Sequence, residues 1–190
     1  MATTNKFEVD PGPEWPSLHV QIVDHDPSWA LRFATERDLL VGAIPSLVGA
    51  LHHFGSTAVR GLAAKPIVDI ALEVSCAISD VPAEALQALR AIGYVHRRRT
   101  HREDMLFLGK GEGHEVHLQV FEQGNAEVAR LVRLRDYLRA HPDEVAAYGT
   151  LKRMLAERHE GSARFYAKDK YLELVGYNDR AQQWEEVNQK

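Results

Sequence analysis

An alternating segment at residues 67–74 restricts the architecture of this chain more than any other segment does. Its even-numbered positions are all apolar, whereas its odd-numbered positions include the carboxylates Asp69 and Glu73. A period of two places these sets on opposite faces of a β-strand. The loop before the segment opens with Gly55 and Ser56. The pattern therefore predicts a strand that buries one face and carries carboxylates on the other, beside a glycine-containing loop.

The surrounding sequence alternates between strand-like and helix-like patterns. Asp26 fits a helix N-cap and Pro27 fits the first helical position, so a helix begins there and ends before Pro45. A second helix is expected at 82–92. Apolar alternation and turn residues predict further strands at 18–22, 48–54, 94–99, 105–108 and 115–121. The last two of these strands are expected to form a hairpin.

From residue 126 onward the pattern is helical. Pro142 and Gly161 divide this region into three helices. We therefore expect three parts: a flexible lead-in at 1–17, an α/β core at 18–123, and a C-terminal helical subdomain at 124–190 that packs on the core.

Composition excludes several classes of protein. The formal net charge is -4, so no global basic field attracts nucleic acid. One cysteine, Cys76, excludes an intrachain disulfide framework and is expected to be a small buried residue. The sequence contains no run of about 18 apolar residues, so no membrane span is predicted. The first 17 residues do not resemble a signal peptide. The expected compartment is the cytoplasm.

The residues between the two central strands suit a phosphorylated ligand. Gly55 lets the backbone approach a ligand closely, and Ser56 and Thr57 with neighbouring N–H groups could cradle phosphate oxygens. Lys65 adds a positive charge. Asp69, thirteen residues after Ser56, is placed to hold Mg²⁺ against those phosphates. The expected ligand is a nucleotide or another phosphorylated small molecule.

The string at 53–70 resembles the signature of the GrpB family, which reads His-x-Gly-Ser-Thr-Ala-Val-Pro-Gly-Leu-x-Ala-Lys-Pro-x-x-Asp-Ile. Arg60 replaces the usual proline. The resemblance covers roughly 20–175. One further family motif precedes this string, at 26–29, and three follow it in the family's order, at 134–139, 148–152 and 166–170. That family is similar to the nucleotidyltransferase superfamily. The resemblance implies an α+β fold with a nucleotidyltransferase-like mixed β-sheet flanked by helices.

The superfamily pairs its Gly-Ser with two carboxylates one residue apart on the next strand and a third on a later strand. Asp69 fits the first position, but Ala71 occupies the second. Glu73 lies two residues further along and is a candidate metal ligand. His117 and Gln119 share a face where the third carboxylate is expected. Two-metal chemistry requires ions about 4 Å apart that carboxylates bridge, so this departure puts it in doubt.

Three functions remain open. The first is Mg²⁺-dependent nucleotidyl transfer from a nucleoside triphosphate to an unidentified acceptor, with Asp69 and Lys65 as catalytic residues. The second is a catalytically degenerate module that binds a nucleotide or a metal, which Ala71 favours. The third is a hydrolase in which His53, Asp69 and His117 hold a divalent transition metal, since imidazole suits such ions. The alternative for the histidines is ordinary hydrogen bonding.

Basic and aromatic residues outside the loop extend the candidate substrate site. Arg97 and Arg99 share one face of a predicted strand and could bind a phosphate, or could instead keep an edge strand solvated. Arg135, Tyr148 and Lys152 lie in the helical tail, where a tyrosine could stack on a base while cations hold phosphates. The alternative is that these helices simply pack on the sheet with their charges in water.

Overall fold

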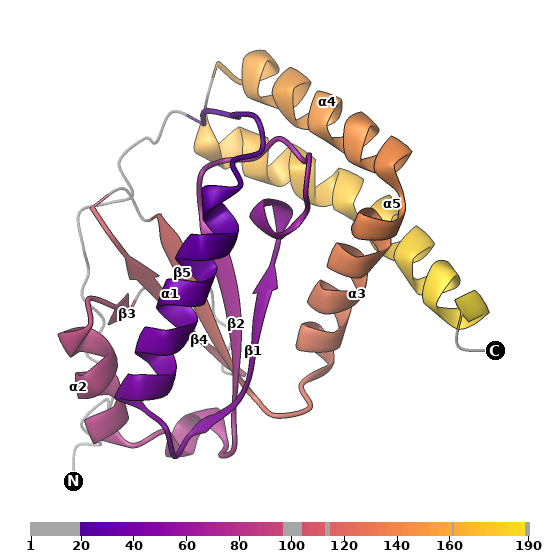
Figure 1. The fold of residues 1–190 in the computed structure, drawn as a ribbon. Coiled ribbons are helices and arrows are strands. Elements are labelled where there is room, and N and C mark those ends of the chain that lie inside the picture. The colour runs from indigo at the N-terminus through magenta and orange to yellow at the C-terminus, as the bar shows by residue number, and fades with distance from the viewer. Residues whose placement is uncertain (1–19, 97–103, 113–114, 161, 189–190) are drawn as a thin grey trace, which may run out of the picture.

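The computed structural model describes residues 20–96, 104–112, 115–160 and 162–188. Figure 1 shows a sheet with helices on both of its faces. The elements in chain order are α1 (Ser28–Ala43), β1 (Val48–Phe54), η1 (Ser56–Ala58), β2 (Val68–Val74), η2 (Ile78–Asp80), α2 (Ala83–Ala91), β3 (Val95–His96), β4 (Met105–Lys110), β5 (Val116–Glu122), α3 (Ala126–Ala140), α4 (Pro142–Arg158) and α5 (Ala163–Asn188). None of the described helices has the length and apolarity that a membrane crossing requires.

The five described strands form one mixed sheet in the order β1-β2-β5-β4-β3. Neighbouring strands are antiparallel except β2 and β5, which run parallel at the centre. The register places Asp69 beside Phe54 on one side and beside His117 on the other. Strand β2 lies between β1, which leads into the Gly-Ser loop, and β5. Asp69, the first carboxylate of β2, therefore lies inside the sheet rather than on an edge strand.

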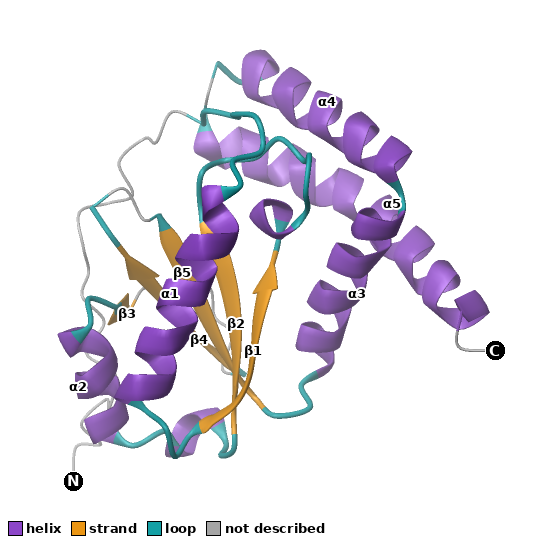
Figure 2. Cartoon of the chain, in the orientation of Figure 1, coloured by secondary structure: helices purple, strands orange, loops and turns teal. Residues whose placement is uncertain are grey.

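The two faces of the sheet are covered by different helices. The even-numbered residues of β2 are almost fully buried with Trp29 and Leu40 of α1 and Leu89 of α2. On the other face, Ala71 is buried with Phe121 and with residues of α3. Figure 2 shows α3 beside β1, with α4 and α5 at the end of the sheet where β1 leads into η1. The predicted alternation of β2 is therefore confirmed.

Most predicted elements are present with small shifts in their ends. The helix at the Asp26-Pro27 pair begins at Ser28, whose N–H donates to Asp26 Oδ1 at 2.8 Å. The strand predicted at 48–54 has those bounds, and the hairpin of β4 and β5 is confirmed. Cys76 is half-buried against the core rather than fully buried.

The strand predicted at 18–22 is wrong for the described residues 20–22, which form no strand. The next residue, Val23, forms an isolated bridge with Ala64. Val20 and Ile22 instead pack against Tyr166 and other residues of the C-terminal helices. Their alternation thus reflects contact with helices rather than membership of the sheet. The lead-in at 1–17 and residues 97–99 of the strand predicted at 94–99 lie outside the described residues, while Val95–His96 of that strand form β3.

Candidate functional site

A cavity of about 210 Å³ lies where the central strands meet the C-terminal helices. The Gly-Ser loop, β2 and β5 form one wall, and α3, α4 and α5 form the other. Polar side chains of its lining include Ser56, Lys65, Asp69, His117, Lys152 and Lys170. The cavity therefore combines residues 54–69 with residues from the C-terminal half of the chain.

Gly55 forms the tight connection between β1 and η1. Its φ and ψ are 71° and −169°, a region that residues with a Cβ avoid. A Cβ at this position would lie 2.7 Å from Oδ2 of Asp69. Close approach of the loop to Asp69 therefore depends on glycine, whereas the sequence predicts a close approach of this backbone to a ligand. The short 3-10 turn that follows carries Ser56 to the cavity and buries Thr57.

Asp69 and His117 form the centre of the strand wall. Oδ1 of Asp69 lies 3.2 Å from Nδ1 of His117, and the imidazole is almost fully buried with its ring 5.1 Å from that of Phe107. Gln119 of β5 also lines the cavity. Within the described part of the chain, no group of three or more His, Cys, Asp and Glu is arranged to hold a metal ion. Asp69, which pairs with His117, is the carboxylate of this wall.

Glu73 does not reach this centre. Its carboxylate pairs with Nε2 of His52 at 2.9 Å and accepts a hydrogen bond from the N–H of Gly124 at 2.8 Å. Ala71, between Asp69 and Glu73, is completely buried in an apolar cluster. The structure therefore does not bring the predicted metal ligand Glu73 to Asp69, because the strand carries it toward the opposite end of the sheet.

His53 lies on the other face of the sheet from Asp69. The register sets it opposite Ile70, whose side chain belongs to the core under α1. Its ring stacks on Phe33 at 4.9 Å, and its Nε2 lies 3.0 Å from Oγ1 of Thr57. Burial lowers the pKa of His53 to about 4, and the charge of Asp69 offsets only part of that shift. The ligand set predicted for a transition metal is therefore divided between two faces.

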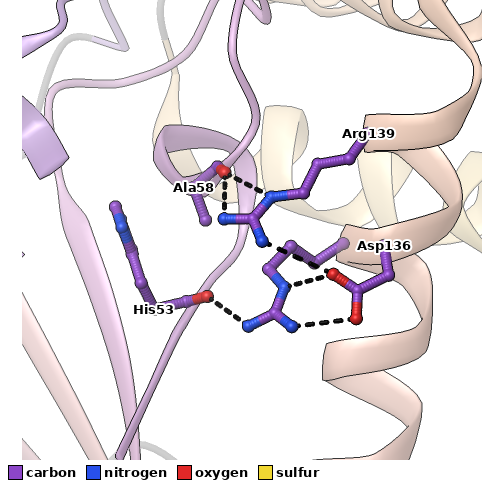
Figure 3. A network of polar contacts seen from close by, with 5 residues as sticks. His53, Ala58, Asp136 and Arg139 are labelled. Atoms are coloured by element: carbon purple, nitrogen blue, oxygen red, sulfur yellow. Dashed lines mark hydrogen bonds and ion pairs between the residues drawn. The ribbon is translucent and has the colours of Figure 1, made fainter.

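Two arginines of α3 hold the backbone of the Gly-Ser loop (Figure 3). Arg135 donates from Nη1 to the carbonyl of His53 at 3.1 Å, and Arg139 donates from Nε and Nη2 to the carbonyl of Ala58 at 3.0 and 2.8 Å. Asp136 pairs with both guanidinium groups. Arg135, a predicted substrate-binding residue, lines the cavity but already has these partners. Its contacts position the loop.

Lys152 is the most unusual residue of the cavity. Its side chain comes from α4 and is only 1% exposed. Nζ donates to Oγ of Ser56 at 2.9 Å and lies 4.6 Å from the centre of the Tyr148 ring. Burial, with smaller contributions from the charges of Lys170 and Arg153, lowers the pKa of Lys152 to about 6. The predicted residues Tyr148 and Lys152 thus do meet the predicted loop.

The charge of the cavity is strongly unequal. Among the residues that the structure describes, its lining has a single carboxylate, that of Asp69. The basic side chains of the lining are Lys65, Arg130, Arg135, Lys152 and Lys170, of which Arg130 and Arg135 are paired with Glu127 and Asp136. Such an arrangement favours an anion, because several cations focus a positive potential in a partly enclosed space.

Sequence reasoning missed part of the helical wall. Arg130 lines the cavity, as do Leu131, Leu134 and Leu138 of α3. The spacing of the leucines places them on one face of a helix, which was the available signal. Arg97 and Arg99, predicted to bind substrate, lie outside the described residues.

A protein family matches most of the chain. The family model described as GrpB protein matches residues 19–176. A UPF0157 protein of Streptomyces coelicolor is 36% identical over 178 residues, which cover 92% of this chain and 89% of that protein. The UPF0157 protein YqkA of Bacillus subtilis is 30% identical over 171 residues, or 90% of this chain. The chain spans about half the length of YqkA, with a coverage of 49%.

Solved structures share the fold. The conserved protein GrpB from Enterococcus faecalis has a TM-score of 0.73 at 28% identity, covering 86% of this chain and 99% of that one. A chain of the GLD-2/RNP-8 complex has a TM-score of 0.52 at 14% identity, covering 76% of this chain and 58% of that one. At that identity the second likeness concerns the fold alone. The predicted nucleotidyltransferase-like α+β fold is confirmed.

Proposed function

This chain belongs to the GrpB family, and from that premise we propose that its cavity binds a nucleoside triphosphate together with Mg²⁺. The observation that carries this proposal is the charge of the lining. Five basic side chains and one carboxylate, in the described part of the chain, surround a loop that presents Ser56 beside its N–H groups. A chain of phosphates matches that arrangement better than a neutral ligand does.

The residues present fit one Mg²⁺ ion rather than two. Mg²⁺ is commonly held by one or two carboxylates together with phosphate oxygens and water. Asp69 would supply the carboxylate. Ala71 and Glu73 supply no second one, because the first is apolar and the second is bound to His52 and Gly124. The ion would offset phosphate charge and orient the ligand on the strand wall.

Nucleotidyl transfer is the second candidate function. The nucleotidyltransferase-like fold and the approach of Gly55 to Asp69 favour it. In this reading Lys65, together with the Mg²⁺ that Asp69 would hold, would offset the negative charge that develops during transfer. The acceptor would be a further molecule, and release of pyrophosphate from the triphosphate would be the measurable sign of the reaction.

Calorimetric titration with the four common nucleoside triphosphates, with and without Mg²⁺, tests the proposal. We expect binding of at least one of them, and stronger binding with Mg²⁺. Asp69→Asn should lower the Mg²⁺-dependent affinity by at least about tenfold, or about 1.4 kcal/mol, because it removes the charge that faces the ion.

Glu73→Gln is the matched control, because this carboxylate lies on the same strand but binds His52 and Gly124 instead. It should leave affinity unchanged. If Asp69 only supports the loop, Asp69→Asn would instead lower the melting temperature and leave the effect of Mg²⁺ intact. No heat of binding and no thermal shift with any triphosphate would refute the proposal.

A further inference from the structure

The contact between Ser56 and Lys152 joins a hydroxyl and an amine that are 96 residues apart in the chain. Both side chains line the cavity, and the distance of 2.9 Å between Oγ and Nζ lies within the range of a nucleophile and its base. A buried lysine whose only role is structural is normally paired with a carboxylate. No described carboxylate forms an ion pair with Lys152 or raises its pKa.

The surroundings of Lys152 favour the unprotonated form of its amine. Removal of the ammonium from water is unfavourable without a counter-ion. The charges of Lys170, from α5, and of Arg153, one residue along α4, oppose protonation as well. The uncharged aromatic ring of Tyr148 lies beside the amine and restricts its position. An unprotonated amine has a lone pair that can accept the proton of a neighbouring hydroxyl.

We propose that Ser56 and Lys152 form a nucleophile–base pair through which the protein phosphorylates itself on Ser56. This inference rests on the proposed function, because the phosphoryl donor is the nucleoside triphosphate bound in the same cavity. It assigns to the two residues a chemical step that binding alone does not require.

The step balances with these groups and the donor. Oγ of Ser56 attacks the terminal phosphorus while its hydroxyl proton passes to Nζ of Lys152. An Oγ–P bond forms, and the bond from that phosphorus to the β–γ bridging oxygen breaks. Nucleoside diphosphate leaves with the electron pair of that bond. The products are a phosphate ester on Ser56 and an ammonium group on Lys152.

Charge favours reaction at the terminal phosphorus. The terminal phosphate carries the largest share of negative charge in the donor, and the charge of Lys170, which also lines the cavity, lies near the amine of Lys152. After transfer, the new ester faces a lysine that has just gained a proton, so a charge-assisted hydrogen bond stabilises the product. Arg139 holds the carbonyl of Ala58, which fixes the turn that presents Ser56.

Labelling with radioactive nucleoside triphosphate tests the inference on the full chain. With Mg²⁺ and γ-labelled donor, we expect label to remain on the denatured protein and to map to Ser56 by peptide mass spectrometry. Ser56→Ala should abolish the label. Lys152→Arg, which keeps a positive charge but cannot act as a base near neutral pH, should slow labelling at least about 100-fold.

Two further variants separate the chemistry from folding. Lys152→Met places an apolar side chain in the buried position, so the protein should stay folded and label as slowly as Lys152→Arg. Lys168→Met removes an exposed lysine of α5 outside the cavity and should label normally. For each variant, the labelling rate is divided by the fraction of protein with bound nucleotide, which calorimetry measures.

The pH profile gives a readout that a structural role would not produce. The base form is needed, so the rate should rise with pH through the pKa of Lys152, about 6 in the free protein, and level off above it. The Lys152→Met variant should lack this rise.

Two outcomes would overturn this inference and leave the proposed function standing. One is triphosphate binding without transfer of the γ-phosphate label to Ser56, and the other is transfer of a label from the α-phosphate to Ser56. Absence of binding would overturn both.

Discussion

Gly55 satisfies two restraints at once. Its backbone occupies a region that is essentially restricted to glycine, and its Cα faces the carboxylate of Asp69. We predict that Gly55→Ala lowers the free energy of unfolding by about 1–3 kcal/mol through backbone strain. The new methyl group must also displace Asp69 or the loop, so triphosphate affinity should fall. Denaturant unfolding and calorimetry measure the two effects.

Gly42→Ala is the control for this prediction. Gly42 lies in α1, and a Cβ built there has no neighbouring atom within 4 Å. The substitution should stabilise the protein by about 0.5–1 kcal/mol, because alanine loses less backbone entropy in a helix. Equal behaviour of the two alanine variants would contradict the special role of the loop conformation.

At the residue scale, the sequence predicts contacts that lie close along the chain. Gly55, Ser56 and Asp69 belong to consecutive parts of a strand, loop and strand, so their proximity follows from local geometry. His53 shows the limit of this reasoning, because a shift of one residue along a strand reverses the face. The contact of Lys152 with Ser56 depends on how α4 packs, which no local pattern specifies.

At the element scale, α3 and the Gly-Ser loop depend on each other through Arg139. We predict that Arg139→Met lowers the free energy of unfolding by about 1.5–3 kcal/mol, because a charged donor leaves the carbonyl of Ala58. It should also weaken triphosphate binding, since η1 loses its support, although Arg139 is not among the residues that line the cavity. Arg139→Lys should recover part of the affinity by restoring one hydrogen bond.

Arg37→Met is the matched surface change. Arg37 lies on α1, is exposed and pairs with its neighbour Asp38. Its loss should change stability by less than about 0.5 kcal/mol and leave affinity as it is. If Arg139→Met behaves like this control, α3 does not support the loop as described.

The elements themselves were largely predictable, and the exceptions have physical causes. Strong alternation and clear turn residues located β1, β2, α2 and the β4–β5 hairpin. Alternation at 18–22 was misleading because packing on helices also requires apolar side chains. The helical region was predictable from the periodicity of its apolar residues. The face that each helix presents to the cavity depends on tertiary packing instead.

At the scale of the whole molecule, we propose that residues 124–190 form a helical subdomain that the sheet requires. The α3 residue Val128 covers Phe54 and Phe121 on the second face of the sheet. Removal of 124–190 should therefore expose that face, and the remaining chain should lose cooperative unfolding and all triphosphate binding. Circular dichroism during heating and calorimetry measure these outcomes.

Removal of 186–190 alone is the control, because the described residues there are exposed at the end of α5. This shorter protein should melt and bind as the full chain does. A chain ending at Gln123 that unfolds cooperatively and binds nucleotide would show that the helices are an independent appendage.

The parallel pairing of β2 with β5 has a consequence for the order of events during synthesis. Residues 75–115 lie between these strands, so the centre of the sheet closes late and at a large cost in chain entropy. A ribosome-bound chain that has exposed only β1 and β2 holds Ser56 and Asp69 but neither His117 nor Lys152. Nucleotide can therefore stabilise the folded state only after translation has passed α4.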